Sequence, residues 1–410
     1  MTSRWFRIGT VAASVTLTGV LVAAVGQAVA AGRHSPPPTE TSLAASTAVQ
    51  WQRTASRTVF AEGALAPPSG ALYLAFTSLA VHEAAQAAQR HGPHAATAAV
   101  TTAAHDVLAE YFPASRTGLA RERDASLARV PQGRMRAEGI RLGERAADAM
   151  ISSRYGDGRG APVVYTRSPA PGIWQPPPDG SMALAWLGAV RPVVDIEPVA
   201  VDGPDPLRSK QYAADFREVV RVGGKDSTVR TAEQTAIATF FAANPVPVYR
   251  EAVCRYLDGE PQTLLATTRL FARMDSAVAT AFIRTWRLKF DIGFWRPFQA
   301  IPAADSDANP ATHPRSDWAP LVTNPSYPDY VSGHAAATSP VAQILRRTFG
   351  DATPLTLQAG GQQRRYASLS DLEHEALNAR IWGGLHFRDA MEDGYRLGHL
   401  TADRVMAAIR

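Results

Sequence analysis

The run KFDIGFWRP, from Lys289 to Pro297, decides how this chain of 410 residues is interpreted. Lys289 and Arg296 are seven residues apart, or two turns of an α-helix, so a continuous helix would present both cations on one face. Pro297 should end or kink that helix just beyond Arg296. The run is otherwise mostly aromatic and apolar, and charges embedded among such residues need a partner. We therefore expect Lys289 and Arg296 to face a common anion.

A second cluster, Ser332-Gly333-His334, leads into an Ala-rich segment with helical spacing. The start of a helix offers free backbone N–H groups and a partial positive charge. Ser332 adds a hydroxyl, and Gly333 lets an oxyanion approach the backbone closely. His334 is placed to give or take a proton at that point. The alternative is a Ser N-cap followed by an incidental histidine.

The third cluster is Arg380 and His386 in the run RIWGGLH, where Gly383 and Gly384 loosen the helix between them. A ring nitrogen of His386 can bond the central atom of an oxyanion, although a single histidine is more often structural. Together the clusters supply three cations, two imidazoles, one hydroxyl and one flexible backbone amide. A tetrahedral or trigonal-bipyramidal oxyanion needs such a set, and the packing of a fold does not.

Bulk composition limits the class of protein. Hydrophobic residues make up 46% and charged residues 19% of the chain, which suits a globular protein with a substantial core. The net charge of +5 is too weak and too scattered to indicate a nucleic-acid-binding protein. The single cysteine, Cys254, excludes an intrachain disulfide and a cysteine-based zinc site.

The N-terminal segment is typical of an export signal. Arg4 and Arg7 precede an apolar stretch from residue 8 to 25, and Ala28-Val29-Ala30 fits a small-x-small cleavage site. An uncleaved membrane anchor is the alternative, because the stretch approaches spanning length. We predict a signal peptide over 1–30, a disordered linker over 31–58, and a secreted α-helical catalytic domain over 59–410 that contains no further membrane span.

The body of the chain is predicted to be all-α, with helix-bundle packing. No strand alternation or internal repeat is convincing, and Thr231 with Gln234 forms a capping-box pattern. Residues 156–205 are rich in proline and glycine, which predicts a long ordered excursion without helices. Helical spacing covers 65–90, 95–111, 134–153, 209–222, 250–256, 263–290, 335–347, 368–381 and 387–409.

The ordered pattern Lys-x6-Arg-Pro, Ser-Gly-His and Arg-x5-His resembles the superfamily of type 2 phosphatidic acid phosphatases and vanadium-dependent haloperoxidases. The resemblance covers roughly residues 60–410, because the His82 helix, the run PGIWQPPP and the run RTAEQTAIATFF also look like the bacterial haloperoxidases. Trp286, three residues before Lys289, and the lack of membrane-spanning segments in the body favour the haloperoxidase branch. The implied fold is the helical bundle of that superfamily.

The resemblance implies a vanadate cofactor, for whose site phosphate would compete. His386 would be the axial ligand of vanadium and His334 the acid–base residue. Hydrogen peroxide, a halide and a small organic acceptor would be the partners, and a homodimer is possible. The residues implied to surround vanadate are Lys289, Arg296, Ser332, Gly333, Arg380, His386 and Trp286.

This sequence departs from the superfamily pattern at some positions, so the residues that would orient His386 and Arg380 stay undecided. Ala390 stands where an aspartate commonly follows the final histidine, and Asp389 comes one residue early. Glu233 is the predicted partner of Arg380 or His386, with a helix first-turn acid as the alternative. Tyr327 occupies a position that differs between chloride- and bromide-oxidising members, so the halide stays undecided.

Two other functions compete with a haloperoxidase. An exported acid phosphatase would use the same pocket, with His386 as nucleophile and His334 as the acid for the leaving group. A binding or scaffold protein would keep the pocket without turnover. The intact set of seven motif positions argues against this last hypothesis.

Overall fold

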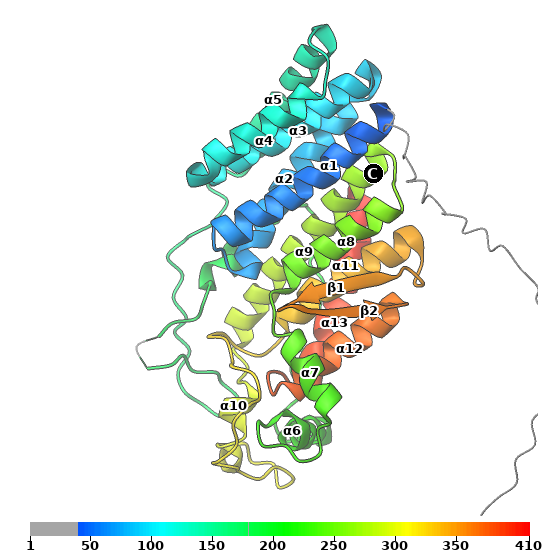
Figure 1. Cartoon of the computed structure of the whole chain (residues 1–410). Helices are drawn as coiled ribbons and strands as arrows, with labels where there is room; N and C mark the ends of the chain where they lie inside the picture. Colours follow the sequence, from blue (N-terminus) through cyan, green and yellow to red (C-terminus); the bar gives the residue numbers. More distant parts are fainter. Residues whose placement is uncertain (1–39, 179) are drawn as a thin grey trace, which may run out of the picture. The chain divides into compact units, whose positions relative to one another are not determined.

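Two layers of helices meet along one long central helix in the computed structural model, which describes residues 40–178 and 180–410 (Figure 1). The predicted signal peptide and residues 31–39 of the predicted linker lie outside the described residues. The described residues, 40–178 and 180–410, belong to one compact unit. None of the helices in the described ranges is both long and apolar enough to cross a bilayer.

The N-terminal layer contains five α-helices, of which α3 and α5 pack closely. The side of α5 that faces α3 carries Gly139 and Gly143, and a Cβ atom at either would collide with a backbone carbonyl of α3. The bounds are α1 (Glu40–Ser56), α2 (Pro67–Ala88), α3 (Gly92–Tyr111), α4 (Arg116–Ala128) and α5 (Arg134–Ser153), with a π-helical turn over Arg57–Glu62 after α1.

The prediction of a disordered linker over 31–58 is wrong for residues 40–58. Helix α1 and the π-helical turn occupy them, and Trp51 and Gln52 are almost fully buried. The Ser-, Thr- and Ala-rich composition lacks a clear apolar stripe, so burial against α3, α8 and α9 stabilises this helix rather than its own amphipathic pattern. Helix α4 was also not predicted.

The C-terminal layer surrounds α9 (Leu264–Ile292), most of whose residues are buried. Helix α9 contacts α1 and α2 on one side and α11 and α13 on the other, so it joins the two layers. The remaining helices are α6 (Lys210–Gly223), α7 (Ala232–Phe240), α8 (Pro245–Gly259), α10 (Pro297–Ala300), α11 (Gly333–Phe349), α12 (Leu369–Trp382) and α13 (Arg388–Ala408). The predicted capping box at the start of α7 is confirmed.

A two-stranded hairpin was missed by the sequence analysis. Strand β1 (Leu355–Ala359) pairs antiparallel with β2 (Gln362–Tyr366), so that Leu355 lies opposite Tyr366. Gly360 and Gly361 connect them with φ angles of 55° and 76°, a left-handed conformation that glycine adopts without strain. The rest of the described chain is helical or loop, and the all-α class with helix-bundle packing is confirmed.

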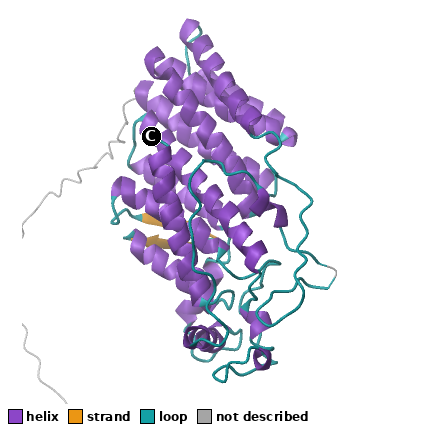
Figure 2. Ribbon diagram, turned by 180° about the vertical axis from the view of Figure 1, so that it is seen from behind, coloured by secondary structure: helices purple, strands orange, loops and turns teal. Residues whose placement is uncertain are grey.

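The proline- and glycine-rich excursion over 156–205 contains no α-helix in its described residues, only a 3₁₀ turn at Ala185–Ala189. Figure 2 shows loop segments gathered toward one end of the helical layers. Trp174 is buried there, and its backbone N–H donates to the carbonyl of Gly293 at 2.7 Å. The excursion is thereby docked on the loop that follows α9, next to the predicted site.

Candidate active site

Helix α9 ends before it reaches Arg296, so the prediction that Lys289 and Arg296 share one helical face is wrong. Gly293 terminates the helix with φ 67°, and a Cβ atom there would collide with the hydroxyl of Tyr165. Arg296 lies beyond the break in extended backbone and is the N-cap residue of α10. The chain therefore turns at Gly293, and Arg296 enters the site from a loop.

Lys289 and Arg296 nevertheless reach the same short loop, and both are fully buried. The ammonium of Lys289 donates to the carbonyls of Pro328 and Asp329 at 2.7 and 2.8 Å. Arg296 donates from Nε to the carbonyl of Tyr327 and from Nη1 to that of Leu385, both at 2.7 Å. Backbone carbonyls orient the two cations but carry no net charge, so they do not neutralise them.

Ser332-Gly333-His334 forms the start of α11, as its pattern predicts. Ser332 is the N-cap, and its hydroxyl oxygen accepts from the N–H of Ala335 at 3.4 Å. A Cβ atom on Gly333 would lie 3.4 Å from the ring of Trp286, so little space separates this backbone from α9. Within the described part of the chain, Nε2 of His334 is buried and has no hydrogen-bond partner.

Arg380 and His386 flank the turn between α12 and α13. Arg380 donates from Nη1 to the carbonyl of Phe241 at 3.0 Å, while its Nε finds no partner among the described residues. Gly384 makes the turn with φ 71°, and a Cβ atom there would lie 2.5 Å from the carbonyl of Gly223. The side chain of His386 beyond it is 2% exposed.

Asp329 connects these clusters, and the sequence analysis gave it no role. Its Oδ1 lies 2.5 Å from Nδ1 of His386 and 3.9 Å from Nη1 of Arg296. The His386 contact is short without being aligned as a hydrogen bond. It engages Nδ1 and leaves Nε2 of His386 as the nitrogen available to a ligand. The signal in the sequence was the acid in the run YPDYVSGH: Asp329 lies three residues before Ser332, and a site with three cations calls for a carboxylate.

Burial dominates the electrostatics of the site. It lowers the pKa of Lys289, Arg296 and Arg380, that of Arg380 to about 9. It also holds the pKa of His334 and His386 well below the ordinary value, and the fields of the three cations lower both further. Because both imidazoles respond to all three cations, these side chains share one site.

The charges of the site do not balance. Asp329 is the carboxylate in contact with this group, and burial raises its pKa to about 7 against the opposing effect of Arg296 and Lys289. The three buried cations thus have one carboxylate near them, and the raised pKa of this carboxylate disfavours its ionised form. An incoming oxyanion would relieve the desolvation of the cations and supply an acceptor to the unpaired Nε–H of Arg380.

The site therefore fits an oxyanion such as vanadate or phosphate. Vanadate would be held through its oxygens by Lys289, Arg296, Arg380, Ser332 and Gly333, and through its metal by His386. No group of three or more His, Cys, Asp or Glu residues suitable for a bare metal ion occurs in residues 40–178 and 180–410. Three buried cations are what an anion pocket supplies.

The predicted supporting residues fall into two groups. Trp286 and Tyr327 lie at the site, with ring centroids 5.0 Å apart, and Tyr327 lies under both Lys289 and Arg296 at 5.0 and 4.9 Å. The prediction for Glu233 is wrong, because this exposed acid pairs with Arg364 at 2.7 Å. Asp389 does not orient His386 either; its Oδ2 accepts from the backbone of Asp205 at 3.2 Å.

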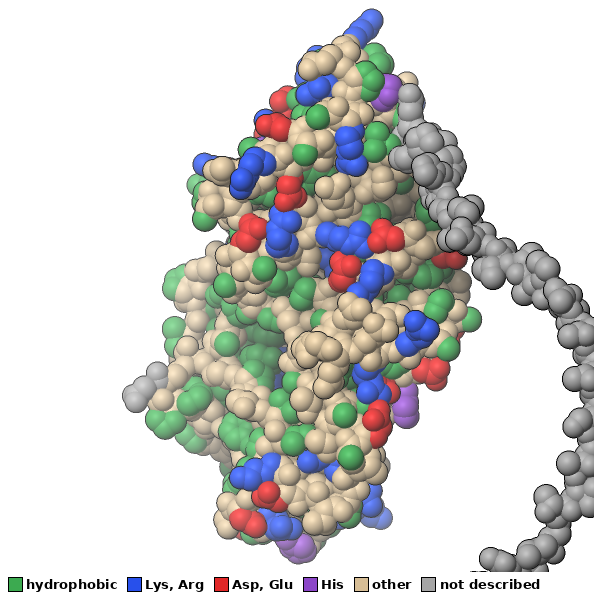
Figure 3. Space-filling model, in the orientation of Figure 1, with side chains coloured by type: hydrophobic (Ala, Val, Ile, Leu, Met, Phe, Trp, Pro, Cys, Tyr) green, Lys and Arg blue, Asp and Glu red, His purple; other side chains and the backbone are tan. Residues whose placement is uncertain are grey.

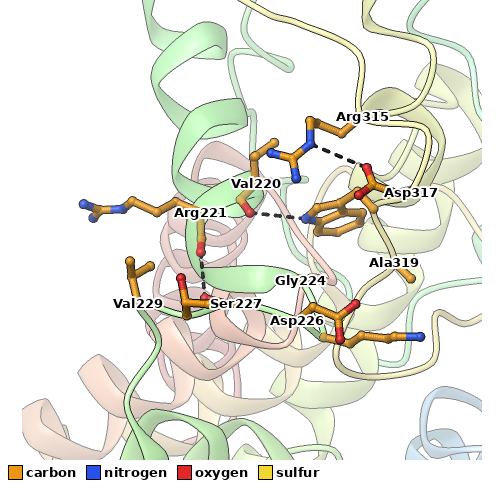
Figure 4. A pocket seen from close by; sticks show the side chains of 12 residues that line it. Val220, Arg221, Gly224, Asp226, Ser227, Val229, Arg315, Asp317 and Ala319 are labelled. Carbon is orange, nitrogen blue, oxygen red and sulfur yellow. Dashed lines mark hydrogen bonds and ion pairs between the residues drawn. The ribbon is translucent and has the colours of Figure 1, made fainter.

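Two cavities in the described part of the chain differ in their relation to this site. One, of about 250 Å³, is lined by Trp286, Tyr327, Gly333 and His334 together with apolar residues. The other, of about 370 Å³, lies beside Trp318, whose indole N–H donates to the carbonyl of Val220 at 3.3 Å (Figure 4). None of the predicted site residues lines this second cavity.

Comparisons with known proteins show what this chain is similar to. A family model described as the VCPO second helical-bundle domain matches residues 269–410. Vanadium chloroperoxidase of Curvularia inaequalis is 31% identical over 180 residues, which cover 36% of this chain and 29% of that protein. The match therefore spans less than a third of that relative's length.

Solved structures extend the likeness to nearly the whole described chain. The first bacterial vanadium-dependent iodoperoxidase superimposes with a TM-score of 0.73 at 19% identity, covering 91% of this chain and 98% of that one. The fold is that of the vanadium haloperoxidases. The holo form of a bacterial vanadium-dependent chloroperoxidase matches with a TM-score of 0.67 at 16% identity, covering 84% of this chain and 93% of that one. The resemblance of the three motifs to this haloperoxidase family is confirmed.

Proposed function

We propose that this protein is a secreted, vanadate-dependent haloperoxidase that oxidises a halide with hydrogen peroxide. The observation that carries the proposal is the surplus of buried positive charge around His386, with Nε2 of His334 and Nε of Arg380 left unpaired. The haloperoxidase fold and the matching second bundle domain support it. The net reaction converts a halide ion, hydrogen peroxide and a proton into hypohalous acid and water.

Each residue of the pocket has a part in this proposal. Lys289, Arg296 and Arg380 hold the oxyanion by charge and direction, and Asp329 orients the ring of His386 toward it. When bound, vanadate would supply a Lewis acid that polarises peroxide, and the vanadium would keep its oxidation state. His334 is neutral at physiological pH because burial lowers its pKa, so Nε2 can accept a proton from peroxide.

The cavity next to His334 favours a haloperoxidase over a phosphatase. A phosphomonoester would bring its charged group and its leaving group past the walls of this cavity, and none of its twelve lining residues is Lys, Arg, Asp or Glu. Peroxide is neutral, and a halide loses less hydration energy than a doubly charged phosphate. The apolar walls therefore suit the substrates of halide oxidation better.

The test combines peroxidase and phosphatase readouts on one vanadate titration. Purified protein freed of phosphate is titrated with orthovanadate and assayed for oxidation of iodide, bromide and chloride by peroxide, and in parallel for hydrolysis of an aryl phosphate. We expect vanadate-dependent halide oxidation that His386→Ala abolishes and His374→Ala, an exposed control on α12, retains. Phosphate hydrolysis that vanadate inhibits, with no halide oxidation, would establish the phosphatase instead.

A further inference from the structure

A third cavity, of about 440 Å³, lies where the proline- and glycine-rich excursion meets α10. Trp174 and Pro177 line it from the excursion, Phe298 lines it from α10, and Asn324 lines it from the loop before α11. On the face that Figure 3 shows, hydrophobic side chains are frequent on the left, where the excursion runs in Figure 1, and charged side chains are sparse there. The polar groups of this cavity are therefore few, and each can be followed.

Asn324 connects this cavity with the anion pocket. Its Oδ1 accepts from Nη1 of Arg296 at 3.3 Å, so the amide is oriented with its oxygen toward the buried cation. The NH2 group therefore points away from Arg296, and its Nδ2 is buried without an acceptor in the described part of the chain. An unpaired N–H donor thus lies beside the positive charge of Arg296.

Trp174 supplies a second donor of the same kind. Its backbone is held on both sides, since its N–H donates to the carbonyl of Gly293 at 2.7 Å and its carbonyl accepts from the hydroxyl of Tyr165 at 3.2 Å. The residue is 1% exposed, and its Nε1 meets no acceptor among the described residues. Each buried N–H group without an acceptor costs free energy, which a ligand that accepts from both groups would recover.

The remaining walls of the cavity carry no charge. Of the nine described residues that line it, none is Lys, Arg, His, Asp or Glu. Ser326 already donates its hydroxyl to the carbonyl of Ser181 at 2.7 Å. Apart from Thr323, the other lining side chains are apolar: Pro177, Phe298, Pro320, Leu321 and Pro325. A ligand here would meet N–H donors, apolar walls and the field of Arg296, and no lining carboxylate would compete with it.

These walls suit a small monovalent anion. Phosphate and vanadate carry several oxygens that each need a donor, and two N–H groups cannot satisfy them. A halide ion accepts from any direction and loses less hydration energy on burial than a doubly charged anion does. The apolar walls should favour bromide and iodide over fluoride, which is the most strongly hydrated halide.

We propose that this cavity is a halide-binding site, in which a bromide or iodide ion accepts from Nε1 of Trp174 and Nδ2 of Asn324. The proposal rests on the proposed haloperoxidase function, for which it names the place that holds the halide before its oxidation. The site lies outside the donors that would hold vanadate, because Asn324 stands between the cavity and Arg296. Pro325 lines both this cavity and the one beside His334, so one shared wall would separate the halide from the acid–base residue.

Binding is tested without vanadate and without turnover. The line width of the bromide NMR signal is titrated with protein whose anion pocket is saturated with phosphate, and iodide or fluoride is added as competitor. We expect broadening that iodide removes and the same concentration of fluoride does not. Trp174→Phe, which removes the N–H and keeps a ring, should weaken bromide binding about tenfold. Trp51→Phe is the matched control, because Nε1 of Trp51 is also buried without a partner but Trp51 does not line the cavity.

A second variant keeps the test valid if Trp174→Phe fails to fold. Asn324→Asp replaces the amide donor with a carboxylate and should abolish the broadening. Anomalous scattering from bromide-soaked crystals of the wild type should place one ion in contact with both nitrogen atoms. No broadening in the wild type, equal broadening in the folded variants, or bromide ions at neither nitrogen would overturn the proposal.

Turnover then separates this site from the function on which it rests. In vanadate-loaded enzyme, Trp174→Phe should raise the KM for iodide about tenfold and leave kcat and the KM for peroxide unchanged, whereas Trp51→Phe should behave as the wild type. An unchanged KM for iodide, or equal rises in both KM values, would refute the halide site. Wild-type protein that broadens the bromide signal but oxidises no halide would refute the haloperoxidase and leave the halide site standing.

Discussion

Two groups of buried charge lie along α9, and they differ in how their charges are balanced. In the first, Arg250 of α8 forms an ion pair with Asp275 of α9, and its Nε donates to the carbonyl of Gln52 at 3.1 Å. Ser78 donates to the second oxygen of Asp275 at 2.5 Å. In the second, around Lys289, Asp329 is the counter-charge of Lys289 and Arg296, and the hydrogen bonds of Lys289 and Arg380 go to neutral carbonyls.

The difference distinguishes a structural ion pair from a ligand site. A buried charge with its partner and hydrogen bonds in place needs nothing further, and it fixes how α1, α2, α8 and α9 pack. A buried surplus of one sign costs free energy that only an incoming opposite charge can recover. Burial alone therefore does not identify the site; the charge balance of the cluster does.

We expect the largest loss of stability when the Arg250–Asp275 ion pair of the first group is broken. Asp275→Asn leaves Arg250 buried without a counter-charge and should lower the free energy of unfolding by about 3–5 kcal/mol. Arg380→Met removes one cation from the surplus and should change that free energy by less than about 1 kcal/mol in phosphate-free buffer. Urea denaturation of both variants measures this. If the two substitutions destabilise the protein equally, the distinction between the clusters is wrong.

Supplying the missing charge should stabilise the second group. An oxyanion that binds only the folded state at one hundred times its dissociation constant raises the free energy of unfolding by about 2.7 kcal/mol. We expect phosphate and orthovanadate to produce this rise in the wild type and in Ala137→Arg, an exposed control, but not in Arg380→Met. Thermal unfolding at fixed ionic strength checks it. A rise of the same size in Arg380→Met would show that the anions act elsewhere.

Asp329 should matter for affinity more than for folding. Asp329→Asn keeps the shape of the side chain but weakens its hold on Nδ1 of His386, so vanadate affinity should fall about 10–100-fold. Adding Ala390→Asp, which restores the acid found at that position in the superfamily, should recover part of the loss. Vanadium NMR of bound vanadate, whose shift reports the histidine ligand, is measured for all three proteins. An unchanged affinity and shift in Asp329→Asn would leave this aspartate with no positioning role.

Asp205, Asp215 and Asp389 form a third group, of negative charge, linked by backbone hydrogen bonds. A substitution in this group should change stability least. Burial raises the pKa of Asp215 to about 6, opposed by the N–H of Asp389, and Asp205 and Glu218 raise it further. The folded pKa lies above the unfolded one, so the ionised carboxylate destabilises the fold increasingly as pH rises from about 4 to 6. Asp215→Asn should thus raise the melting temperature by about 2 °C at pH 8 and leave it unchanged at pH 4. The opposite pH dependence would contradict this sign.

The sequence predicted the parts of the molecule that local chemistry determines. Proline and glycine density predicted the helix-free excursion, and the capping pattern at Thr231 predicted the start of α7. The three motifs predicted which side chains meet, because a helix start, a chain break and a glycine turn each expose donors at known positions. The hairpin was missed because β2 reads QQRRY, in which no apolar alternation appears, although Gly360 and Gly361 mark its turn.

Contacts between distant segments could not be predicted in the same way. Asp329 and His386 are 57 residues apart and meet only because α11, α12 and α13 pack together, so no spacing rule links them. The predicted role of Glu233 was wrong for a related reason: the hairpin brings Arg364 to it, and the sequence analysis had no hairpin. Helix α1 was assigned to a linker because its Ser-, Thr- and Ala-rich sequence shows little periodicity, whereas Trp51 is buried by tertiary contacts.

The central claim is that the surplus of buried positive charge is a binding site for one vanadate ion per chain, centred on His386. Isothermal titration of orthovanadate into phosphate-free protein measures it most directly, with His386→Ala and the surface control His374→Ala alongside. The account predicts one site per chain in the wild type and in His374→Ala, and at least about a hundredfold weaker binding in His386→Ala. Equal binding by His386→Ala, or none by the wild type, would contradict it.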